Sequence, residues 1–428
     1  MIFLLTGQST MNAGVLDMNP QINKIIYIFE QPFTARIFDI YGIETLIAHG
    51  FDVEIWDLTP YLHSTFFMKI DEGESMAFDK CKKFENKRDI VAALSNVPSD
   101  ALINCFIPFN RHTFFIYNMF SVKNIKYCVS NMISFPTQCI QQKSQLTRLK
   151  SALVNATDIL KQKHGVSNLY NAIVSKYCLP GIRPADIALL SGERSLELTN
   201  DRLIGKKTRL LWVHNHDYDV YLKLRNIKSN IDPKLVVFLD DYLPLSTDYY
   251  YINQQPPIGV DEYYAKIRSF FDYVEMNYHV RIVIAAHPRS KYSESVNYFG
   301  GRTIIKGRTA ELVQESSVVF AHMSTSINYA VLFRKPLVFI TMDKLQNRTR
   351  GRYFVGAYIE TIAQSLNKNP INIDDVTQLD WEKELHIDME SYARYQNNFI
   401  KKEGTPEIPF WEIFAQNLKK LTFRENEG

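Results

Sequence analysis

The sequence predicts an α/β protein with two Rossmann-like, doubly wound domains that face each other across a cleft. Short apolar runs alternate with segments of helical periodicity in both halves of the chain, which is typical of parallel sheets covered by helices. The apolar runs are almost uninterrupted, as expected for strands buried on both faces. The chain has 428 residues, a length that suits two domains of about 200 residues each.

The first predicted domain spans residues 24–230 and begins with a β-α-β unit. The strand KIIYIFE ends at Glu30, a helix with a mostly apolar face runs from Arg36 to His49, and the strand DVEIWDL follows Gly50. The alternation continues with helices at 88–94 and 112–119, a mostly polar helical region at 142–163, and the strands ALINCFIP, IKYCVSN, DIALLSG and TRLLWVHN. Residues 1–23 have no clear period, so we expect a loose leader there or an artefact of an upstream start.

The second predicted domain spans residues 231–380, and its boundary falls in the polar run NIKSNIDP. It opens with the strand in LVVFLDDYLP and continues with an amphipathic helix from Asp261 to Tyr278. Three further apolar runs are expected to be buried strands: Ile282 to Ala286, Val318 to Ala321, and Leu337 to Ile340.

Residues 381–428 are expected to form helices that cross back to pack on the first domain. The last of them carries Phe410, Trp411, Phe414, Leu418 and Leu421 together with Lys419 and Lys420. The same composition suits a helix that lies on an anionic membrane surface. Packing against the body of the protein is the interpretation we adopt.

Composition excludes several classes of function. Lys and Arg number 49 against 46 Asp and Glu, so no basic excess indicates a nucleic-acid-binding surface. The five cysteines are scattered without a CxxC pair, which predicts a reducing, cytoplasmic setting without a disulfide framework or structural zinc. No stretch approaches the roughly 20 apolar residues that cross a bilayer. We therefore expect a cytoplasmic protein, with a peripheral position on the inner face of the cell membrane as the alternative.

Two polar clusters follow predicted strands of the second domain. His287, Pro288 and Arg289 come after one strand, and Ser324, Thr325 and Ser326 stand between another strand and a helical pattern. Carboxyl ends of parallel strands are where open α/β sheets bind ligands. Hydroxyl groups and backbone N–H groups at a helix start suit a phosphate, and His287 is suited to bind a phosphate or protonate one that departs. The alternatives are a capping role for Ser324 and a loop carbonyl as the partner of His287.

Charged residues nearby extend this candidate site. Asp240 and Asp241 follow a buried strand and are candidate general bases, or carboxylates that face a developing positive charge. The basic residues are candidate contacts to a phosphate or to a sugar carboxylate; they are Arg289, Arg302, Lys306 and Arg308. Glu311 lies in the first turn of a predicted helix, where it either binds a ribose hydroxyl or interacts favourably with the helix dipole.

The segment HNHDYDVY contains a DxD pattern formed by Asp217 and Asp219. Such a pattern binds a manganese-nucleotide in A-type glycosyltransferases, but three-letter patterns are frequent by chance. We interpret His214 or Asp217 as a residue of the first domain that faces the cleft and supplies the acceptor base. The prediction is therefore that the site holds no metal.

The motifs of the second domain carry a resemblance to known families. SSVVFAHMSTSINYAVLFRKPLVFIT resembles the strand, Ser/Thr loop, helix and Lys-Pro-strand stretch of CDP-glycerol glycerophosphotransferases and capsule polysaccharide transferases, in which the hydroxyl loop holds the donor pyrophosphate. IVIAAHPRS is similar to the His-Pro motif that those families share with bacterial sialyltransferases and Kdo transferases, which use CMP-activated donors. FLDDYLP looks like the acidic strand-end motif of such enzymes, with Tyr242 where sialyltransferases have glycine.

The resemblance covers roughly a quarter of the chain, residues 235–341, and implies a B-type (GT-B) glycosyltransferase. The expected reaction transfers an acidic sugar, a sialic-acid-like nonulosonate or Kdo, from a CMP donor to a cell-surface glycan such as a lipopolysaccharide or capsule. Its partners would be the nucleotide-sugar donor and a glycan or lipid-linked glycan acceptor, with no cofactor. The alternatives are a CDP-glycerol-type polyol-phosphate transferase and a non-catalytic nucleotide- or glycan-binding subunit of a polysaccharide assembly complex.

Overall fold

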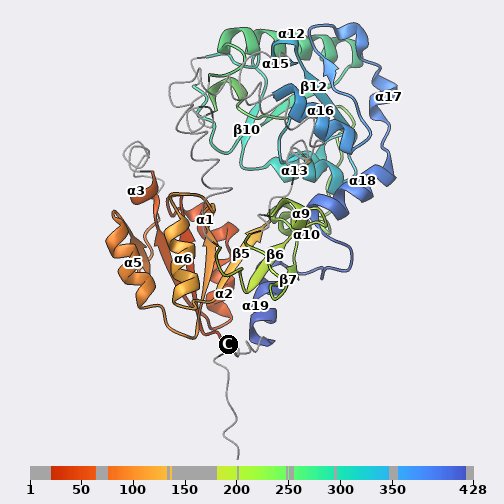
Figure 1. Ribbon diagram of the computed structural model, residues 1–428. Coiled ribbons are helices and arrows are strands. Elements are labelled where there is room, and N and C mark those ends of the chain that lie inside the picture. The colour runs from red at the N-terminus through yellow and green to blue at the C-terminus, as the bar shows by residue number, and fades with distance from the viewer. Residues whose placement is uncertain are drawn as a thin grey trace, which may run out of the picture.

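A computed structural model describes residues 21–63, 76–132, 135–136, 181–199, 202–246, 249, 255–293, 296–346 and 355–420. Two parallel sheets lie one above the other in Figure 1, each flanked by helices, which confirms the predicted fold class. The predicted helical region 142–163 and the segment 1–20 lie outside the described residues.

The first sheet has seven strands within the described residues, in the order β3-β2-β1-β4-β5-β6-β7, and all its pairings are parallel. Its strands are β1 (Lys24–Phe29), β2 (Asp52–Asp57), β3 (Cys81–Lys83), β4 (Ala101–Phe106), β5 (Tyr127–Asn131), β6 (Ile187–Leu190) and β7 (Arg209–Trp212). Its helices are α1 (Ala35–Ile40), α2 (Ile43–Ala48), α3 (Thr59–Leu62), α5 (Lys87–Ser95), α6 (Phe114–Val122) and α9 (Ser195–Leu198).

Side chains of β1 show why this sheet is covered on both faces. Tyr27 and Phe29 belong to an apolar cluster that includes residues of α1 and α2, whereas Ile26 and Ile28 belong to a second cluster with residues of α5 and α6. Successive side chains of a strand point to opposite faces of the sheet. An uninterrupted apolar strand therefore needs helices on both sides, as the sequence predicted.

The second sheet has the order β10-β9-β8-β11-β12-β13 among the described residues and is also parallel. Its strands are β8 (Leu235–Leu239), β9 (Arg281–Ala286), β10 (Ile304–Lys306), β11 (Val318–Ala321), β12 (Leu337–Thr341) and β13 (Ile371–Asn372). Its helices are α12 (Val260–Tyr278), α13 (Thr309–Glu315), α14 (Ile327–Leu332), α15 (Asp343–Gln346) and α16 (Val355–Ser365). The strand order reverses between β8 and β11, which makes this the topological switch point.

The chain crosses between the domains twice, and the two crossings are joined by hydrogen bonds. The first leads from β7 to α10 (His216–Leu224), and the second leads from α18 (Met389–Tyr395) and the helical turn 396–400 to α19 (Phe410–Lys420). The N–H of Asn215 donates to the carbonyl of Ile400 at 3.0 Å, and His214 forms an antiparallel bridge with Lys401. These contacts hold the two connecting segments together, and we call this pair of segments the hinge.

Packing at these crossings refines the predicted domain limits. Helix α10 packs on α13 and α14, and its Tyr218 belongs to the core of the second domain, so the packing boundary lies before α10. Tyr392 and Tyr395 of α18 also belong to that core. Among the described C-terminal helices, α19 packs on the first domain, where Phe410, Trp411, Phe414 and Leu418 are buried, whereas α18 packs in the core of the second.

The helix predicted from Arg36 to His49 is in fact two short helices, α1 and α2. Gly42 interrupts it with a backbone φ of +57°, a left-handed conformation that favours glycine. A Cβ atom at this position would lie 2.1 Å from Cγ of Trp411 in α19. The break follows from the arrival of a helix almost 370 residues further on, which local periodicity cannot reveal.

Candidate functional site

The switch point of the second sheet brings the predicted motifs together. Asp240 and Asp241 follow β8, and the neighbouring strands β9 and β11 end at His287 and at the loop 322–326. The two polar clusters predicted from sequence are thus separated by one strand, and the acidic pair stands between them. The structure therefore places the predicted His-Pro, Asp-Asp and Ser/Thr motifs at one sheet edge.

The two carboxylates hold the loops on either side of β8. Asp240 is buried and accepts hydrogen bonds from the N–H of Tyr242 (2.9 Å), the N–H of His287 (3.3 Å) and the hydroxyl of Tyr292 (2.7 Å). Asp241 accepts from the N–H of Met323 at 3.0 Å. Burial raises the pKa of both carboxyl groups, that of Asp241 to about 7.

His287 is held in a defined tautomer. Its Nδ1 accepts a hydrogen bond from the N–H of Arg289 at 3.1 Å, so the neutral ring carries its proton on Nε2. The ring is half-buried, whereas Pro288 and Arg289 are exposed. His287 therefore lies at the edge of the sheet with its Nδ1 atom engaged by the turn that follows it.

The hydroxyl loop precedes a short helix. Ser326 is the N-cap residue of α14, and its N–H donates to the hydroxyl oxygen of Ser324 at 3.4 Å. Thr325 is exposed, and Ser324 and Ser326 are half-buried. Three hydroxyl groups thus follow β11 at the switch point, where the sequence predicted a phosphate-binding loop.

His322, at the start of this loop, has a structural role. Its Nδ1 donates to the carbonyl of Ile340 at 2.6 Å, which leaves Nε2 to accept from the hydroxyl of Tyr263 at 3.0 Å. The side chain is completely buried, and burial lowers its pKa to about 4. We therefore expect a neutral imidazole that joins α12, β11 and β12.

Tyr242 occupies the position where the resembling motif has glycine. Its φ is +53°, in the left-handed region that is uncommon for residues with a side chain. The fold thus keeps a glycine-type backbone after the acidic pair. The tyrosine ring lies edge-on to Tyr292, with 5.2 Å between the ring centroids.

The predicted basic residues do not share one role. Lys306 is exposed at the end of β10 and donates to the carbonyl of Ser290 beside the His-Pro turn at 3.0 Å. Arg308 is exposed and lies 3.6 Å from the carboxylate of Glu315. The prediction for Arg302 as a ligand contact is wrong, because its largely buried guanidinium bonds two carboxylates of α12, Asp272 and Glu275, each at 2.6 Å.

Glu311 lies in the first turn of α13, as predicted, and is half-buried. Its negative charge contributes to raising the pKa of the Tyr329 hydroxyl in α14, after burial and Asp217. Helix α13, which carries Glu311, packs on α14, the helix that follows the hydroxyl loop.

The DxD pattern does not bring its two carboxylates together. Asp217 accepts a hydrogen bond from Nδ2 of Asn328 in α14 at 2.7 Å, whereas Asp219 accepts one from the N–H of Phe410 at 2.9 Å. Within the described residues, no group of three His, Cys, Asp or Glu side chains is arranged to hold a metal ion. The two aspartates serve separate contacts.

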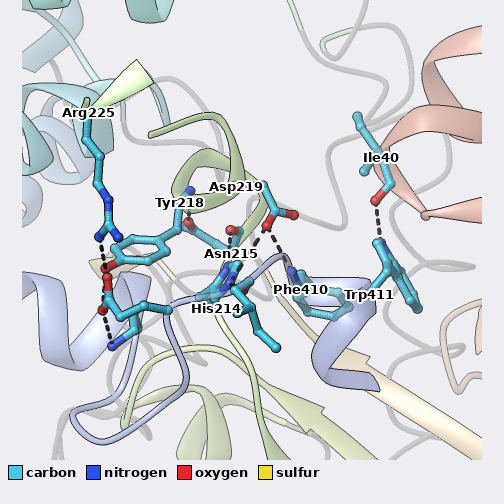
Figure 2. A network of polar contacts seen from close by, with 11 residues as sticks. Ile40, His214, Asn215, Tyr218, Asp219, Arg225, Phe410 and Trp411 are labelled. Atoms are coloured by element: carbon cyan, nitrogen blue, oxygen red, sulfur yellow. Dashed lines mark hydrogen bonds and ion pairs between the residues drawn. The ribbon is translucent and has the colours of Figure 1, made fainter. Parts of the chain in front are cut away.

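The interpretation of His214 as a cleft residue is wrong. Figure 2 shows it inside the hinge, where it is completely buried and its Nε2 donates to the carbonyl of Ile408 at 2.8 Å. Glu407, in the segment before α19, accepts from the hydroxyl of Tyr218 (2.8 Å) and from Arg225 and Lys401. These residues connect α10 to the segment that leads into α19.

One polar pair of the first domain was not selected from the sequence. Glu30 follows β1 at the switch point between β1 and β4, and its Oε2 lies 3.4 Å from Nε2 of His63 at the end of α3. Both side chains are about 40% exposed. Glu30 and His63 are 33 positions apart in the sequence. The end of strand β1 was therefore the only signal for this pair in the sequence.

The fold defines a class of architecture. Two Rossmann-like domains, with a C-terminal helix that returns to the first domain, form the GT-B arrangement. No helix in the described part of the chain is long and apolar enough to cross a membrane.

Comparisons with solved structures find proteins that match most of the chain at low sequence identity. The chain is similar to a UDP-GlcNAc 2-epimerase from Neisseria meningitidis bound to UDP-GlcNAc, with 13% identity, a TM-score of 0.44, and coverage of 93% of this chain and 100% of that one. It is also similar to the wall teichoic acid polymerase TagF (10% identity, TM-score 0.44, coverage 94% and 90%) and to MurG from Acinetobacter baumannii (7%, 0.44, 93% and 100%). No protein-family model and no curated protein matches the sequence. At these identities the similarity concerns the fold alone.

Proposed function

We propose that the protein is a glycosyltransferase that binds a nucleotide-activated sugar at the carboxyl edge of the sheet in its second domain. The observation that carries this proposal is the shared sheet edge of the second domain. There His287 and the loop 324–326 flank the switch point. Asp240 accepts the backbone N–H of His287, and Asp241 accepts that of Met323, directly before the loop. Such an edge, with fixed N–H and hydroxyl donors, suits the phosphates of a nucleotide.

In this proposal His287 binds the donor phosphate through Nε2–H. Through the same Nε2–H group, the neutral ring stabilises the negative charge on the phosphate that leaves with its nucleotide. The hydroxyl groups of Ser324, Thr325 and Ser326 are further donors, and Arg289 and Lys306 add positive charge beside the His-Pro turn. Glu311 is the proposed partner of a ribose hydroxyl.

The acidic pair has a positioning role in the proposed site. The oxygens of Asp240 already accept three hydrogen bonds, and Asp241 accepts the N–H of Met323. We therefore assign the acceptor base to the first domain, where Glu30 stands at the switch point beside His63. A carboxylate there takes the proton of an acceptor hydroxyl, and the histidine orients it.

The donor we propose is a CMP-linked acidic sugar, and the acceptor is a surface glycan or its lipid-linked precursor. The exposed Arg289 and Lys306 support this choice, because an acidic sugar adds a carboxylate to the charge of the phosphate. We propose a reaction without a metal cofactor, since Asp217 and Asp219 have separate partners. A cytoplasmic location, with peripheral contact to the inner membrane face, belongs to the same proposal.

The test is nucleotide binding by calorimetry with CMP, CDP, UDP and GDP, with and without Mn²⁺. The wild-type protein, His287→Ala and the control His386→Ala, an exposed histidine of the same domain, are compared. We expect cytidine nucleotides to bind without metal, and His287→Ala to weaken that binding about tenfold, the loss typical of one hydrogen bond to a charged group. With a CMP-sugar donor, the same variant should lose at least about 100-fold in turnover.

Other outcomes would refute the proposal or replace part of it. Metal-dependent binding of UDP or GDP would contradict the donor and the metal-free reaction. Release of CMP from CDP-glycerol, with transfer of the glycerophosphate, would identify a polyol-phosphate transferase. If no nucleotide binds, the proposal fails and a non-catalytic glycan-binding subunit becomes the better explanation.

A further inference from the structure

Asp217 lies where the first crossing between the domains meets the helix after the hydroxyl loop. It is the second residue of α10, which packs on α13 and α14. Its Oδ2 accepts from Nδ2 of Asn328 at 2.7 Å, and the hydroxyl of Tyr329 interacts with the same carboxylate. Both partners lie in α14, so one side chain makes two polar contacts with one short helix.

Asn328 is fixed at both ends of its amide. Its Nδ2 donates to Asp217, and its Oδ1 accepts from the hydroxyl of Tyr395 in α18 at 3.2 Å. The side chain is 4% exposed. Loss of either partner would leave a buried amide group without its hydrogen bond.

The same two residues of α14 are joined directly to the hydroxyl loop. The N–H of Asn328 donates to the carbonyl of Thr325 at 3.2 Å, and the N–H of Tyr329 donates to the carbonyl of Ser326 at 3.0 Å. Helix α14 has six residues, too few to be stable on its own backbone hydrogen bonds. Its orientation, and that of the loop, therefore depends on contacts from neighbouring elements.

Two alternative roles of Asp217 fit these contacts less well. A metal ligand of the DxD type needs Asp219 beside it, but Asp219 bonds the N–H of Phe410 in the hinge. A general base needs a carboxylate that can receive a proton from the acceptor, whereas this carboxylate interacts with Asn328 and Tyr329. Burial raises the pKa of Asp217, and the Asn328 hydrogen bond is the largest influence that opposes the rise.

We propose that Asp217 is a positioning residue that fixes α14 and thereby holds residues 324–326 in the geometry that binds the donor phosphate. Its function is exerted through Asn328 and Tyr329, and it forms no bond to substrate or metal. The inference rests on the proposed function for its ligand, but the contact between α10 and α14 can be tested without one.

The experiment compares Asp217→Ala, Asp217→Asn and the control Asp261→Ala. Asp261 is also an aspartate in the first turn of a helix of the second domain, but it is exposed. The amide oxygen of asparagine can accept the same hydrogen bond, so Asp217→Asn preserves the contact with Asn328. Hydrogen exchange of the amides at 326–332 is measured without ligand, and CMP affinity is measured by calorimetry.

We expect Asp217→Ala to speed exchange in α14 at least about tenfold and to weaken CMP binding by about tenfold. Asp217→Asn should stay within about threefold of wild type in both measurements, and the control should match wild type. In a kinetic assay with a donor that the enzyme consumes, Asp217→Ala should raise KM more than it lowers kcat.

Three results would overturn the inference. Unchanged exchange in α14 for Asp217→Ala would show that the residue does not hold the helix. An equal loss of kcat in Asp217→Asn and Asp217→Ala with unchanged CMP affinity would identify a catalytic base. If Asp217→Ala exchanges faster in α14 but binds CMP as wild type does, the order of α14 does not affect nucleotide binding. Failure of the wild-type protein to bind any nucleotide would refute the proposed function instead, and the exchange measurement would still decide whether Asp217 holds α14.

Discussion

The buried His322 and the half-buried Asp241, at the edge of the second sheet, should make stability depend on pH in opposite directions. His322 has a pKa of about 4 in the folded protein, compared with an ordinary value of 6.5. Asp241 has a pKa of about 7, compared with 3.8. Both shifts are caused mainly by burial, which disfavours the charged form of each group. Because the groups have opposite charge types, their effects on unfolding oppose each other.

The direction in which His322 changes stability with pH follows from proton binding. Between about pH 4 and 6.5 the unfolded chain binds a proton at this ring and the folded protein does not, so stability falls as the pH falls. A displacement from 6.5 to about 4 corresponds to about 3 kcal/mol in full, at about 1.4 kcal/mol per pKa unit. About 2 kcal/mol of this should be lost between pH 7 and pH 5.

The sign for Asp241 is the reverse. Its folded-state pKa lies above the unfolded value, so its contribution to stability is complete below about pH 3.8 and is lost as the pH rises through about 7. The two pH windows overlap. The wild-type protein should therefore show a shallower pH dependence in this range than either single variant.

The assay measures the free energy of opening of β11 and β12 by native-state hydrogen exchange at pH 7, 6 and 5. This local readout avoids the assumption that a two-domain protein unfolds in one step. His322→Gln should leave stability rising as the pH falls, because only the Asp241 effect remains. Asp241→Asn should leave it falling, by about 2 kcal/mol between pH 7 and pH 5.

The control is His386→Gln, which changes an exposed histidine of the same domain. It should have the same pH dependence as wild type. If the difference between wild type and His322→Gln varies by less than about 0.5 kcal/mol over this range, the imidazole does not titrate as its burial indicates, and the reasoning is refuted.

Three further predictions concern packing and the hinge. Gly42→Ala should lower unfolding free energy by about 1–3 kcal/mol more than Gly50→Ala, because both have positive φ but only the first meets Trp411; equal melting temperatures would contradict this. Arg302→Met should lower stability by about 1 kcal/mol, because Asp272 and Glu275 lose their guanidinium partner but remain partly exposed to solvent, while CMP affinity stays unchanged in calorimetry; a loss of affinity would show that Arg302 contributes to the nucleotide site. Burial raises the Glu407 pKa, but hydrogen bonds led by that from Lys401 outweigh burial and hold the pKa at about 2. The wild-type protein should therefore lose stability as the pH falls from about 4.5 towards 2, and Glu407→Gln should abolish this loss. If urea unfolding shows the same loss of stability at acid pH in the variant, the prediction is wrong.

Much of the sheet architecture was predictable because the local sequence indicates which strands are buried on both faces. Runs such as Leu235–Leu239 and Val318–Ala321 are apolar at every position, and only a strand covered on both faces requires this. The short edge strands β3 and β10 were not predicted, since CKK and IIK carry no such run. Their pairing depends on the neighbouring strand and not on their own composition.

The candidate site was predictable in part for the same reason. Polar residues directly after buried strands must lie at the carboxyl edge, so the place of His287 and of residues 324–326 in the fold was predictable from the sequence. Side-chain direction was not predictable. Arg302 has the same type of sequence context as Lys306, yet one bonds α12 and the other reaches the His-Pro turn.

The sequence by itself determined the alternation of strands and helices, the two-domain division and the location of the main polar motifs, because each depends on residues near one another in the chain. The tertiary structure decided which partners those motifs have. It alone joined Asp217 to Asn328, His214 to Ile408 and Glu30 to His63, over separations of 111, 194 and 33 residues. Hydrogen bonds between distant residues depend on how whole helices and domains pack, and no local periodicity encodes that packing.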